Sequence, residues 1–191
     1  MNTLDYYNKN AEEYASQTVT ADVSDLYTDF EACLNPGASI LDLGCGSGRD
    51  SKHFMTKGYN VTPVDGAAEM CKLASDYIGI PVLCKQFSEL NYRNEFDGIW
   101  ACASLLHVPK SKMERTMAKV SRALKPDGVL YASFKYGEGE REVLGRHFSY
   151  YSETDLDELF PELGLIEYWI SEDTRPDRSG EKWLNALWRK S

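Results

Sequence analysis

The stretch Ile40-Leu41-Asp42-Leu43-Gly44-Cys45-Gly46-Ser47-Gly48-Arg49-Asp50 joins an apolar strand to three glycines at alternate positions, followed by polar residues that open a helix. Glycine tolerates a positive φ and has no Cβ. The backbone can therefore turn sharply at the carboxyl end of the strand, and a ligand can lie against its amides. The pattern indicates a nucleotide-cofactor loop.

The spacing of these glycines separates two kinds of cofactor. A dinucleotide fingerprint reads G-x-G-x-x-G, and the pyrophosphate needs bare amide donors. Here the loop reads Gly44-x-Gly46-x-Gly48, and Asp42 lies within the preceding strand. A carboxylate would repel a pyrophosphate but can attract an ammonium group, so the loop argues against NAD.

Apolar segments and helical patterns alternate along the rest of the chain. Strands are expected over 39–43, 60–64, 81–85, 96–102 and 129–134, and helices over 51–57, 67–77 and 110–124. Repeated crossovers of this kind predict a parallel sheet with helices on both faces. A short helix over 153–160 then precedes two strands, 165–170 and 183–188, which we expect to form an antiparallel hairpin at the sheet edge.

Composition limits the organisation of the chain and its partners. With 191 residues, 42% hydrophobic and 27% charged, the sequence predicts one domain over 1–191, with a helical lead-in over 1–35 and an α/β core over 36–191. The first residues lack a basic and apolar leader, and no apolar run could span a bilayer, so we expect a cytoplasmic protein without a membrane partner. The oligomeric state is not readable from the sequence.

Cysteine spacing and net charge argue against two further classes of site. The five cysteines stand singly, without C-x-x-C spacing, which predicts reduced thiols and no metal. A net charge of -9 disfavours nucleic acid as a partner. One exception is a set of basic residues on a single helix face, where a solvated surface and a docking surface are both open readings. They are Lys112, Arg115, Lys119 and Arg122.

Four motifs in order, LDLGCGSGRDS, VTPVDGAAEM, FDGIWACASLLHV and LKPDGVLYASFK, resemble those of the class I S-adenosylmethionine (SAM) dependent methyltransferases. Within that superfamily the chain is similar to small bacterial tellurite-resistance-type methyltransferases. The resemblance implies an α/β fold with a Rossmann-like, doubly wound, mostly parallel seven-stranded sheet and a C-terminal antiparallel hairpin. It also implies SAM as the cofactor and S-adenosylhomocysteine as the product.

Asp65 ends the second strand about 20 residues after the glycine loop, where a carboxylate can accept hydrogen bonds from both ribose hydroxyls. An NAD enzyme would place an acid there too, so Asp65 alone does not separate the two cofactors. Gln86 stands where family members often carry an acid that accepts from the adenine amino group, and its amide oxygen can do the same. The resemblance implies further cofactor contacts from Tyr6 and Tyr14 in an N-terminal lid, and from Asp42, Gly44, Cys45, Gly46, Arg49, Gly66, Met70, Phe87, Ala101, Ala103 and Ser104.

His107 follows the fourth strand, at the edge where the methyl group would be transferred. The segment lacks both the [Asn/Asp]-Pro-Pro-aromatic motif of amino-group methylation and the Pro-Cys nucleophile of cytosine C5 methylation. His107 is either a general base or a residue that packs beside the cofactor, and both readings stay open.

The acceptor side carries basic and aromatic residues. Lys135 and Tyr136 lead from the fifth strand into a polar loop with Arg141 and Arg146, and Arg175, Arg178 and Trp183 come later. Arginine binds carboxylates and oxyanions, so an anionic small molecule is the expected acceptor. Two alternatives are an RNA or protein methyltransferase and a non-catalytic SAM-binding regulatory protein.

Overall fold

A parallel sheet forms around the glycine-rich stretch in the computed structural model, which describes residues 2–173, 175 and 178–191. β1 (Ser39–Leu43) pairs in parallel with β2 (Asn60–Asp65) on one side and β4 (Phe96–Ala101) on the other. β3 (Leu83–Cys84) extends the sheet beyond β2, and β5 (Leu124–Tyr136) extends it beyond β4. β1 and β4 are almost entirely buried, as expected for parallel strands covered on both faces.

Two antiparallel strands complete the seven strands that the sequence analysis predicts. β8 (Leu163–Glu172) and β9 (Lys182–Lys190) form a hairpin, and β9 pairs antiparallel with β5. The order β3-β2-β1-β4-β5-β9-β8 confirms the seven expected strands, the doubly wound arrangement and the C-terminal hairpin.

A second hairpin corrects the prediction of a polar loop after the fifth strand. β6 (Glu140–Val143) and β7 (Arg146–Tyr151) pair antiparallel, and β7 joins the end of β5. The connecting residues Leu144 and Gly145 have φ of +53° and +79°, the pair of positive values that a two-residue type I′ turn requires. The prediction failed because a turn of this kind is normally signalled by Asn-Gly or Asp-Gly, and Leu-Gly gave no such signal.

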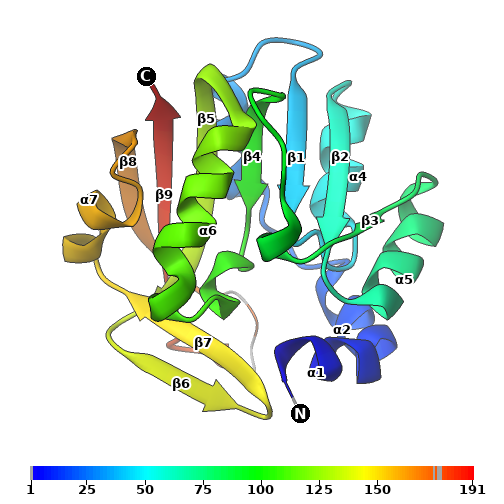
Figure 1. Ribbon diagram of the computed structural model, residues 1–191. Coiled ribbons are helices and arrows are strands. Elements are labelled where there is room, and N and C mark those ends of the chain that lie inside the picture. Colours follow the sequence, from blue (N-terminus) through cyan, green and yellow to red (C-terminus); the bar gives the residue numbers. More distant parts are fainter. Residues whose placement is uncertain (1, 174, 176–177) are drawn as a thin grey trace.

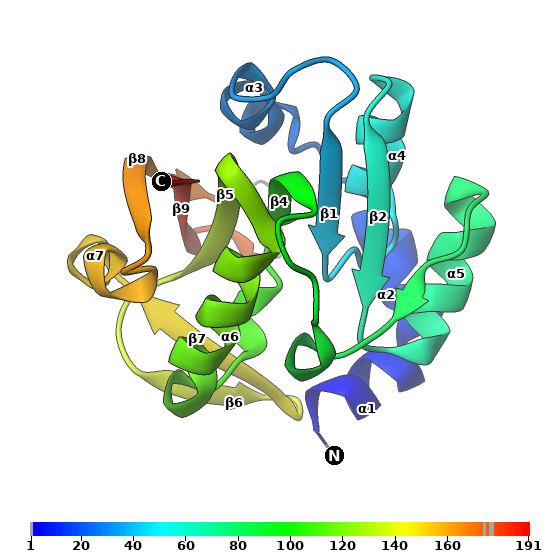
Figure 2. The same cartoon turned by 45° about the horizontal axis from the view of Figure 1, so that its top comes forward.

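Helices cover both faces of the sheet. α6 (Lys110–Ala123) packs its apolar side on one face, whereas α3 (Ser24–Ala32) and α4 (Arg49–Thr56) pack on the other. Figure 2 shows α3 and α4 on the opposite side of the sheet from α6. α5 (Ala68–Ile78) follows β2, and α7 (Leu156–Leu159) lies beside β8.

The carboxyl ends of β1, β2 and β4 point to the same edge of the sheet, the lower edge in Figure 1. α1 (Thr3–Lys9), α2 (Ala11–Thr18) and the β6–β7 hairpin lie at that edge. Ligands of open α/β sheets bind at this edge, where the strand order reverses. None of the helices in the described part of the chain has the length and apolar character needed to cross a membrane.

Candidate functional site

The glycine loop brings β1 against the end of β4. Gly44, Gly46 and Gly48 have φ of +80°, +53° and +81°. A Cβ on Gly44 would lie 2.4 Å from the Cβ of Ser104, closer than two carbon atoms can approach. Ser104 also donates a hydrogen bond of 2.5 Å from its Oγ to the carbonyl of Leu43. Glycine is therefore required at position 44 by both its backbone conformation and the neighbouring segment.

The Asp65 carboxylate holds this loop in place. Its Oδ2 accepts from the Gly46 amide at 3.0 Å and its Oδ1 accepts from the Ala67 amide at 2.9 Å. Burial raises the pKa of Asp65, while these backbone donors lower it. Each oxygen has a further lone pair, so the carboxylate can still accept hydrogen bonds from a bound ligand.

Two cavities meet at the glycine loop. The Asp65 cavity, of about 630 Å³, lies between α1, α6 and the segment after β3. The Arg146 cavity, of about 550 Å³, lies between the α2–α3 connection, β7 and the β8–β9 hairpin. The residues that line both are Tyr7, Tyr14, Gly44, Gly46, Cys102, Ala103 and His107. A ligand in one cavity can therefore reach a ligand in the other only past this small group.

Most residues proposed for the cofactor lie at these cavities. The Asp65 cavity is lined by Tyr14, Gly44, Gly46, Asp65, Gly66, Met70, Gln86, Phe87, Ala103, Ser104 and His107. Cys45 and Arg49 lie instead at the Arg146 cavity. Tyr6, Asp42 and Ala101 line neither cavity. Ala101 is fully buried within β4, which removes it from contact with a ligand.

Asp42 is directed into the protein interior rather than toward a ligand. It is 2% exposed and its Oδ2 accepts a hydrogen bond of 2.5 Å from Ser51 on α4. Burial and the neighbouring Asp50 raise the pKa of Asp42, while the hydrogen bond from Ser51 lowers it. The Asp42 carboxyl lines neither cavity, and a direct attraction of a ligand ammonium by it stays a prediction.

Asp50 holds together one wall of the Arg146 cavity, and the sequence analysis did not identify it as a site residue. Its carboxylate accepts hydrogen bonds from Tyr27 at 2.6 Å, Trp100 at 2.8 Å and the Arg49 Nε at 2.6 Å. Burial alone would raise the Asp50 pKa, but Arg49 and the other donors hold it below its usual value. Arg49 is thus fixed against the wall of the Arg146 cavity as part of a buried ion pair. The only available signal was that Asp50 opens a helix, which many solvated acids also do.

His107 has both ring nitrogens occupied. Its Nδ1 lies 2.7 Å from the carbonyl of His147, and its Nε2 lies 2.8 Å from the hydroxyl of Tyr7. Because a carbonyl can only accept, Nδ1 carries the proton and Nε2 accepts from Tyr7. Burial, with the positive charge of Arg146 nearby, lowers the pKa of His107 to about 4. The ring is therefore neutral at pH 7 and is bound to the N-terminal helix.

Tyr7 occupies the place that the sequence reasoning gave to Tyr6. It lines both cavities and meets the Tyr14 ring edge-on with 5.0 Å between ring centroids. The Tyr6 ring instead lies 4.3 Å from the guanidinium of Arg146. Tyr7 and Tyr14 lie on two separate helices, α1 and α2, so helical spacing does not relate them and no local sequence signal identifies this pair.

Arg146 is the one of the four proposed acceptor residues that lines a cavity in the described structure. Lys135 instead pairs with the carboxylate of Glu181, Arg141 lies over the ring of Tyr150, and Tyr136 reaches neither cavity. Arg146 is 7% exposed, and its buried Nε has no hydrogen-bond partner. Within the described residues no carboxylate forms an ion pair with it.

The β8–β9 hairpin supplies the outer wall of the Arg146 cavity. Asp173 accepts from Arg175 at 2.6 Å and from the Trp183 indole at 3.0 Å. Burial would raise the pKa of Asp173, but these donors lower it to about 2. Arg175, Arg178 and Trp183 all line this cavity, as do Trp169 and Asn185, which the sequence did not indicate. No three His, Cys, Asp or Glu side chains gather as metal ligands among the residues that the structure describes.

Comparison with known proteins shows that part of this sequence resembles known methyltransferases. Residues 40–128 match the family model described as a methyltransferase domain. The protein named "Putative methyltransferase YqeM" of Bacillus subtilis is 34% identical over 120 residues, which cover 57% of this chain and 49% of YqeM. Ubiquinone biosynthesis O-methyltransferase of Xanthomonas campestris is 32% identical over 106 residues, which cover 51% of this chain and 43% of that protein. The chain spans about half, or less, of the length of the curated relatives it matches.

Two solved structures share the fold over almost the whole chain. Burkholderia thailandensis 1,6-didemethyltoxoflavin-N1-methyltransferase, solved with its named substrate and S-adenosylhomocysteine, superposes with a TM-score of 0.82 and 23% identity, covering 98% of this chain and 87% of that one. TehB of Haemophilus influenzae gives a TM-score of 0.74 and 20% identity, covering 98% of this chain and 66% of that one. These likenesses confirm the fold that the four motifs led us to expect.

Proposed function

We propose that this chain is a class I SAM-dependent methyltransferase that transfers a methyl group from SAM to a small-molecule acceptor; its fold and the methyltransferase-domain match over residues 40–128 support the proposal. The observation that carries the proposal is that two cavities meet at the glycine loop and share part of their lining. The Asp65 cavity offers a glycine loop and a carboxylate on one side, and the Arg146 cavity offers a separate chamber on the other. A regulatory SAM-binding protein would not need the second chamber. We treat residues 1–191 as one methyltransferase domain, and a cytoplasmic location stays a prediction.

The residues of the Asp65 cavity fit SAM. We assign the Asp65 carboxylate to the ribose hydroxyls, Gly66 and Met70 to the adenosine, and Gln86 and Phe87 to the adenine, and all of them line this cavity. The absence of a Cβ at Gly44 lets the loop pack against Ser104 at the wall of this cavity. Asp65 carries the recognition in this proposal, since each of its oxygens keeps an acceptor site beside its hydrogen bond to the loop.

The junction residues act by orientation. When bound, SAM would supply a methyl group activated by its positively charged sulfur. The acceptor forms a bond to the methyl carbon as the carbon–sulfur bond breaks, and S-adenosylhomocysteine is released. Tyr7, Tyr14 and Ala103 line the passage between the cavities and restrict the direction of approach. Ala103 has a φ of +52° and its amide donates to Ser133 at 2.8 Å, so the backbone at the passage is fixed in an unusual conformation. Holding the reactants in line is a large part of the rate enhancement available to such a transfer.

In this proposal His107 holds the N-terminal helix α1 in place and does not act as a general base. Its Nε2 is bound to Tyr7, and its lowered pKa makes it a weak base at neutral pH. An acceptor that needs no proton removed, such as a carboxylate, a thiolate or an oxyanion, matches this junction. Arg146 supports the same assignment, because its buried guanidinium lacks a carboxylate partner among the described residues and faces the acceptor chamber.

Replacement of Arg146 tests the proposal. Purified protein is incubated with SAM and a panel of carboxylates, thiols and oxyanions including tellurite, and S-adenosylhomocysteine is measured. For an acceptor that reacts, Arg146→Gln should raise KM by about 10- to 100-fold, since a charge-assisted contact is lost, and should leave the Kd for SAM nearly unchanged.

Arg141→Gln is the matched control, because Arg141 lies on the same hairpin but outside both cavities, and it should behave as wild type. Equal effects of the two substitutions would remove Arg146 from the acceptor site. Absence of S-adenosylhomocysteine with every acceptor, in protein that binds SAM, would favour the regulatory alternative.

A further inference from the structure

The outer part of the Asp65 cavity is strongly basic. Lys85, Lys112, Arg115 and Lys119 line it, and Asp65 is the one carboxylate-bearing residue among the described residues of that lining. The whole chain carries 30 acidic and 21 basic residues, so such a concentration of positive charge runs against the overall balance. Its position over a cavity distinguishes it from the solvated helix face that the sequence alone would allow.

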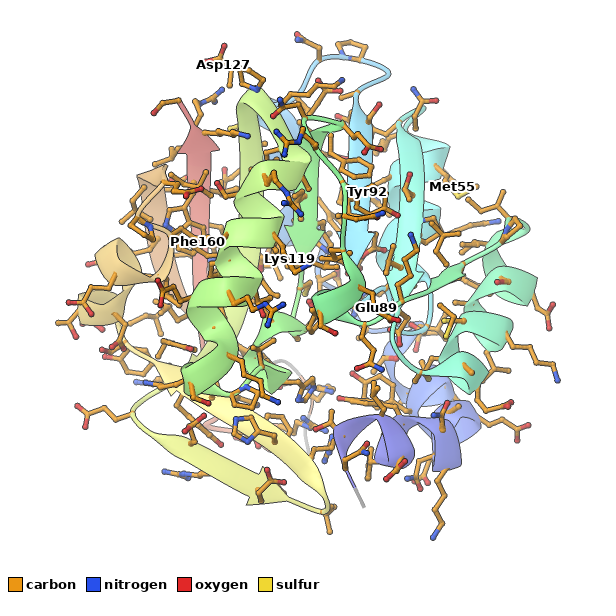
Figure 3. All side chains as sticks on the ribbon, in the orientation of Figure 1. Met55, Glu89, Tyr92, Lys119, Asp127 and Phe160 are labelled. Atoms are coloured by element: carbon orange, nitrogen blue, oxygen red, sulfur yellow. The ribbon has the colours of Figure 1, made fainter. Side chains whose placement is uncertain are left out.

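The geometry of α6 produces the cluster. Lys112, Arg115 and Lys119 are spaced three and four residues apart and share one side of the helix, while Met113 and Met117 pack on the sheet. The basic side faces the segment that follows β3. Figure 3 shows Lys119 on the side of α6 turned to the stretch that carries Glu89 and Tyr92.

Two of the four cations are held by that stretch. The Lys119 Nζ donates a hydrogen bond of 2.8 Å to the carbonyl of Leu90, and the Lys85 Nζ lies 5.1 Å from the centroid of the Tyr92 ring. Both side chains are partly buried, so less conformational entropy is lost when they bind an anion. Lys112 and Arg115 line the same cavity from the preceding turns of α6.

SAM does not explain these charges. The cofactor carries a sulfonium and an ammonium against one carboxylate, so it has a net positive charge that four nearby cations would repel. Phosphate is the group that several lysines and an arginine bind most effectively, because each provides charge together with hydrogen-bond donors. We propose that the outer part of the Asp65 cavity is a binding site for a ligand that carries two or more phosphate groups.

The surroundings of the cluster favour a compact ligand over a nucleic acid chain. Arg122 continues the basic face of α6 but does not line the cavity. Exposed carboxylates stand beside the cluster at Glu89 and Glu114, and the net charge of -9 would repel an extended polyanion. The positive field is therefore confined to the opening.

Calorimetric titration with inorganic tripolyphosphate at low salt tests the site directly. Wild type should show saturable binding, and Lys112→Gln and Arg115→Gln should each weaken it by about tenfold through loss of one charge-assisted contact. Both residues are exposed, so neither substitution should disturb folding. Arg122→Gln is the control and should bind as wild type does.

The phosphate source is resolved by repeating the titration with ATP, with and without saturating S-adenosylhomocysteine. Tighter binding of ATP that S-adenosylhomocysteine abolishes would identify an adenine nucleotide, whereas equal binding of ATP and tripolyphosphate would identify the phosphate chain alone. Absence of saturable tripolyphosphate binding would overturn the proposal. So would equal weakening by Arg122→Gln, or tighter binding of single-stranded RNA than of tripolyphosphate, because each indicates a diffuse surface. None of these readouts depends on methyl transfer.

Discussion

Gly44 combines a positive φ with a neighbouring segment that leaves no room for a Cβ. Its φ is +80° and a Cβ there would collide with Ser104, whereas Gly58 has a φ of +88° with nothing within 4 Å of the same position. The two positions share the backbone strain that a side chain would introduce, but only Gly44 adds a collision at the ligand site.

Gly44→Ala should therefore abolish SAM binding, and Gly58→Ala should preserve it. Both variants should lose about 1 to 2 kcal/mol of stability from the left-handed conformation. Calorimetry for SAM and urea unfolding separate the two effects. Normal SAM affinity in folded Gly44→Ala or Gly44→Val protein would show that the glycine loop is an ordinary turn, and the functional proposal would fall with it.

Among the elements, α1 spans the opening between the β6–β7 hairpin and α5. Thr3 accepts from the His147 amide at 3.0 Å, Asn8 accepts from the Glu69 amide at 3.0 Å, and Tyr7 donates to His107. Two of these hydrogen bonds are partly buried and one is exposed, and each is a single contact to one side chain of α1 that can break without disturbing the core. The helix is therefore suited to open and close over the junction.

Removal of the Tyr7 hydroxyl tests this coupling. Tyr7→Phe should weaken SAM binding by about 1 kcal/mol, because the His107 Nε2 loses its donor and α1 loses one tie. Tyr6→Phe is the control, since its ring can still pack on Arg146. In a double-mutant cycle, Tyr7→Phe and His107→Gln should show a coupling energy of about 1 kcal/mol. Strictly additive effects would mean that the hydrogen bond does not contribute to binding.

The success of the sequence reasoning also differs between elements. The seven main strands were predictable because apolar runs and turn residues alternate locally along the chain. Asp65 and the glycine loop were predictable for the same reason, since the contacts lie within one strand-loop-helix unit. The β6–β7 hairpin was missed because its Leu-Gly turn lacks the usual Asn-Gly or Asp-Gly signal, whereas Tyr7 and Asp50 depend on contacts between segments far apart in the chain. Tyr7 meets a residue 100 positions away and Asp50 meets one 50 positions away, and no local pattern encodes such pairings.

At the scale of the whole molecule, the titration of His107 makes the stability of the folded protein depend on pH. Its pKa is about 4 when folded and about 6.5 when unfolded. Above pH 6.5 both states are neutral at this residue, and below it the unfolded chain takes up a proton that the folded chain refuses. The stability that neutral His107 contributes is thus complete above pH 6.5 and is lost as the pH falls toward 4.

Urea unfolding at pH 7 and pH 5 measures this linkage. From pH 7 to pH 5 the free energy of unfolding of wild type should fall by up to about 2 kcal/mol more than that of His107→Gln, in which position 107 cannot titrate. Comparing the two proteins cancels the opposing contributions of Asp42 and Asp65, whose pKa values are raised. An identical pH dependence in both proteins would show that His107 titrates normally in the folded state.

The attachment of the β6–β7 hairpin has a consequence for the evolution and engineering of acceptor range. In the described part of the chain the hairpin pairs with the central sheet at two positions, Lys135 with Tyr150 and Tyr136 with Tyr151, and it carries Arg146 to the Arg146 cavity. Length and sequence between Gly137 and Arg146 can therefore vary with little effect on the framework that holds the cofactor loop. A library randomised across this segment would explore new acceptors while retaining one methyl-donor site, and lineages of such enzymes could diversify by the same exchange.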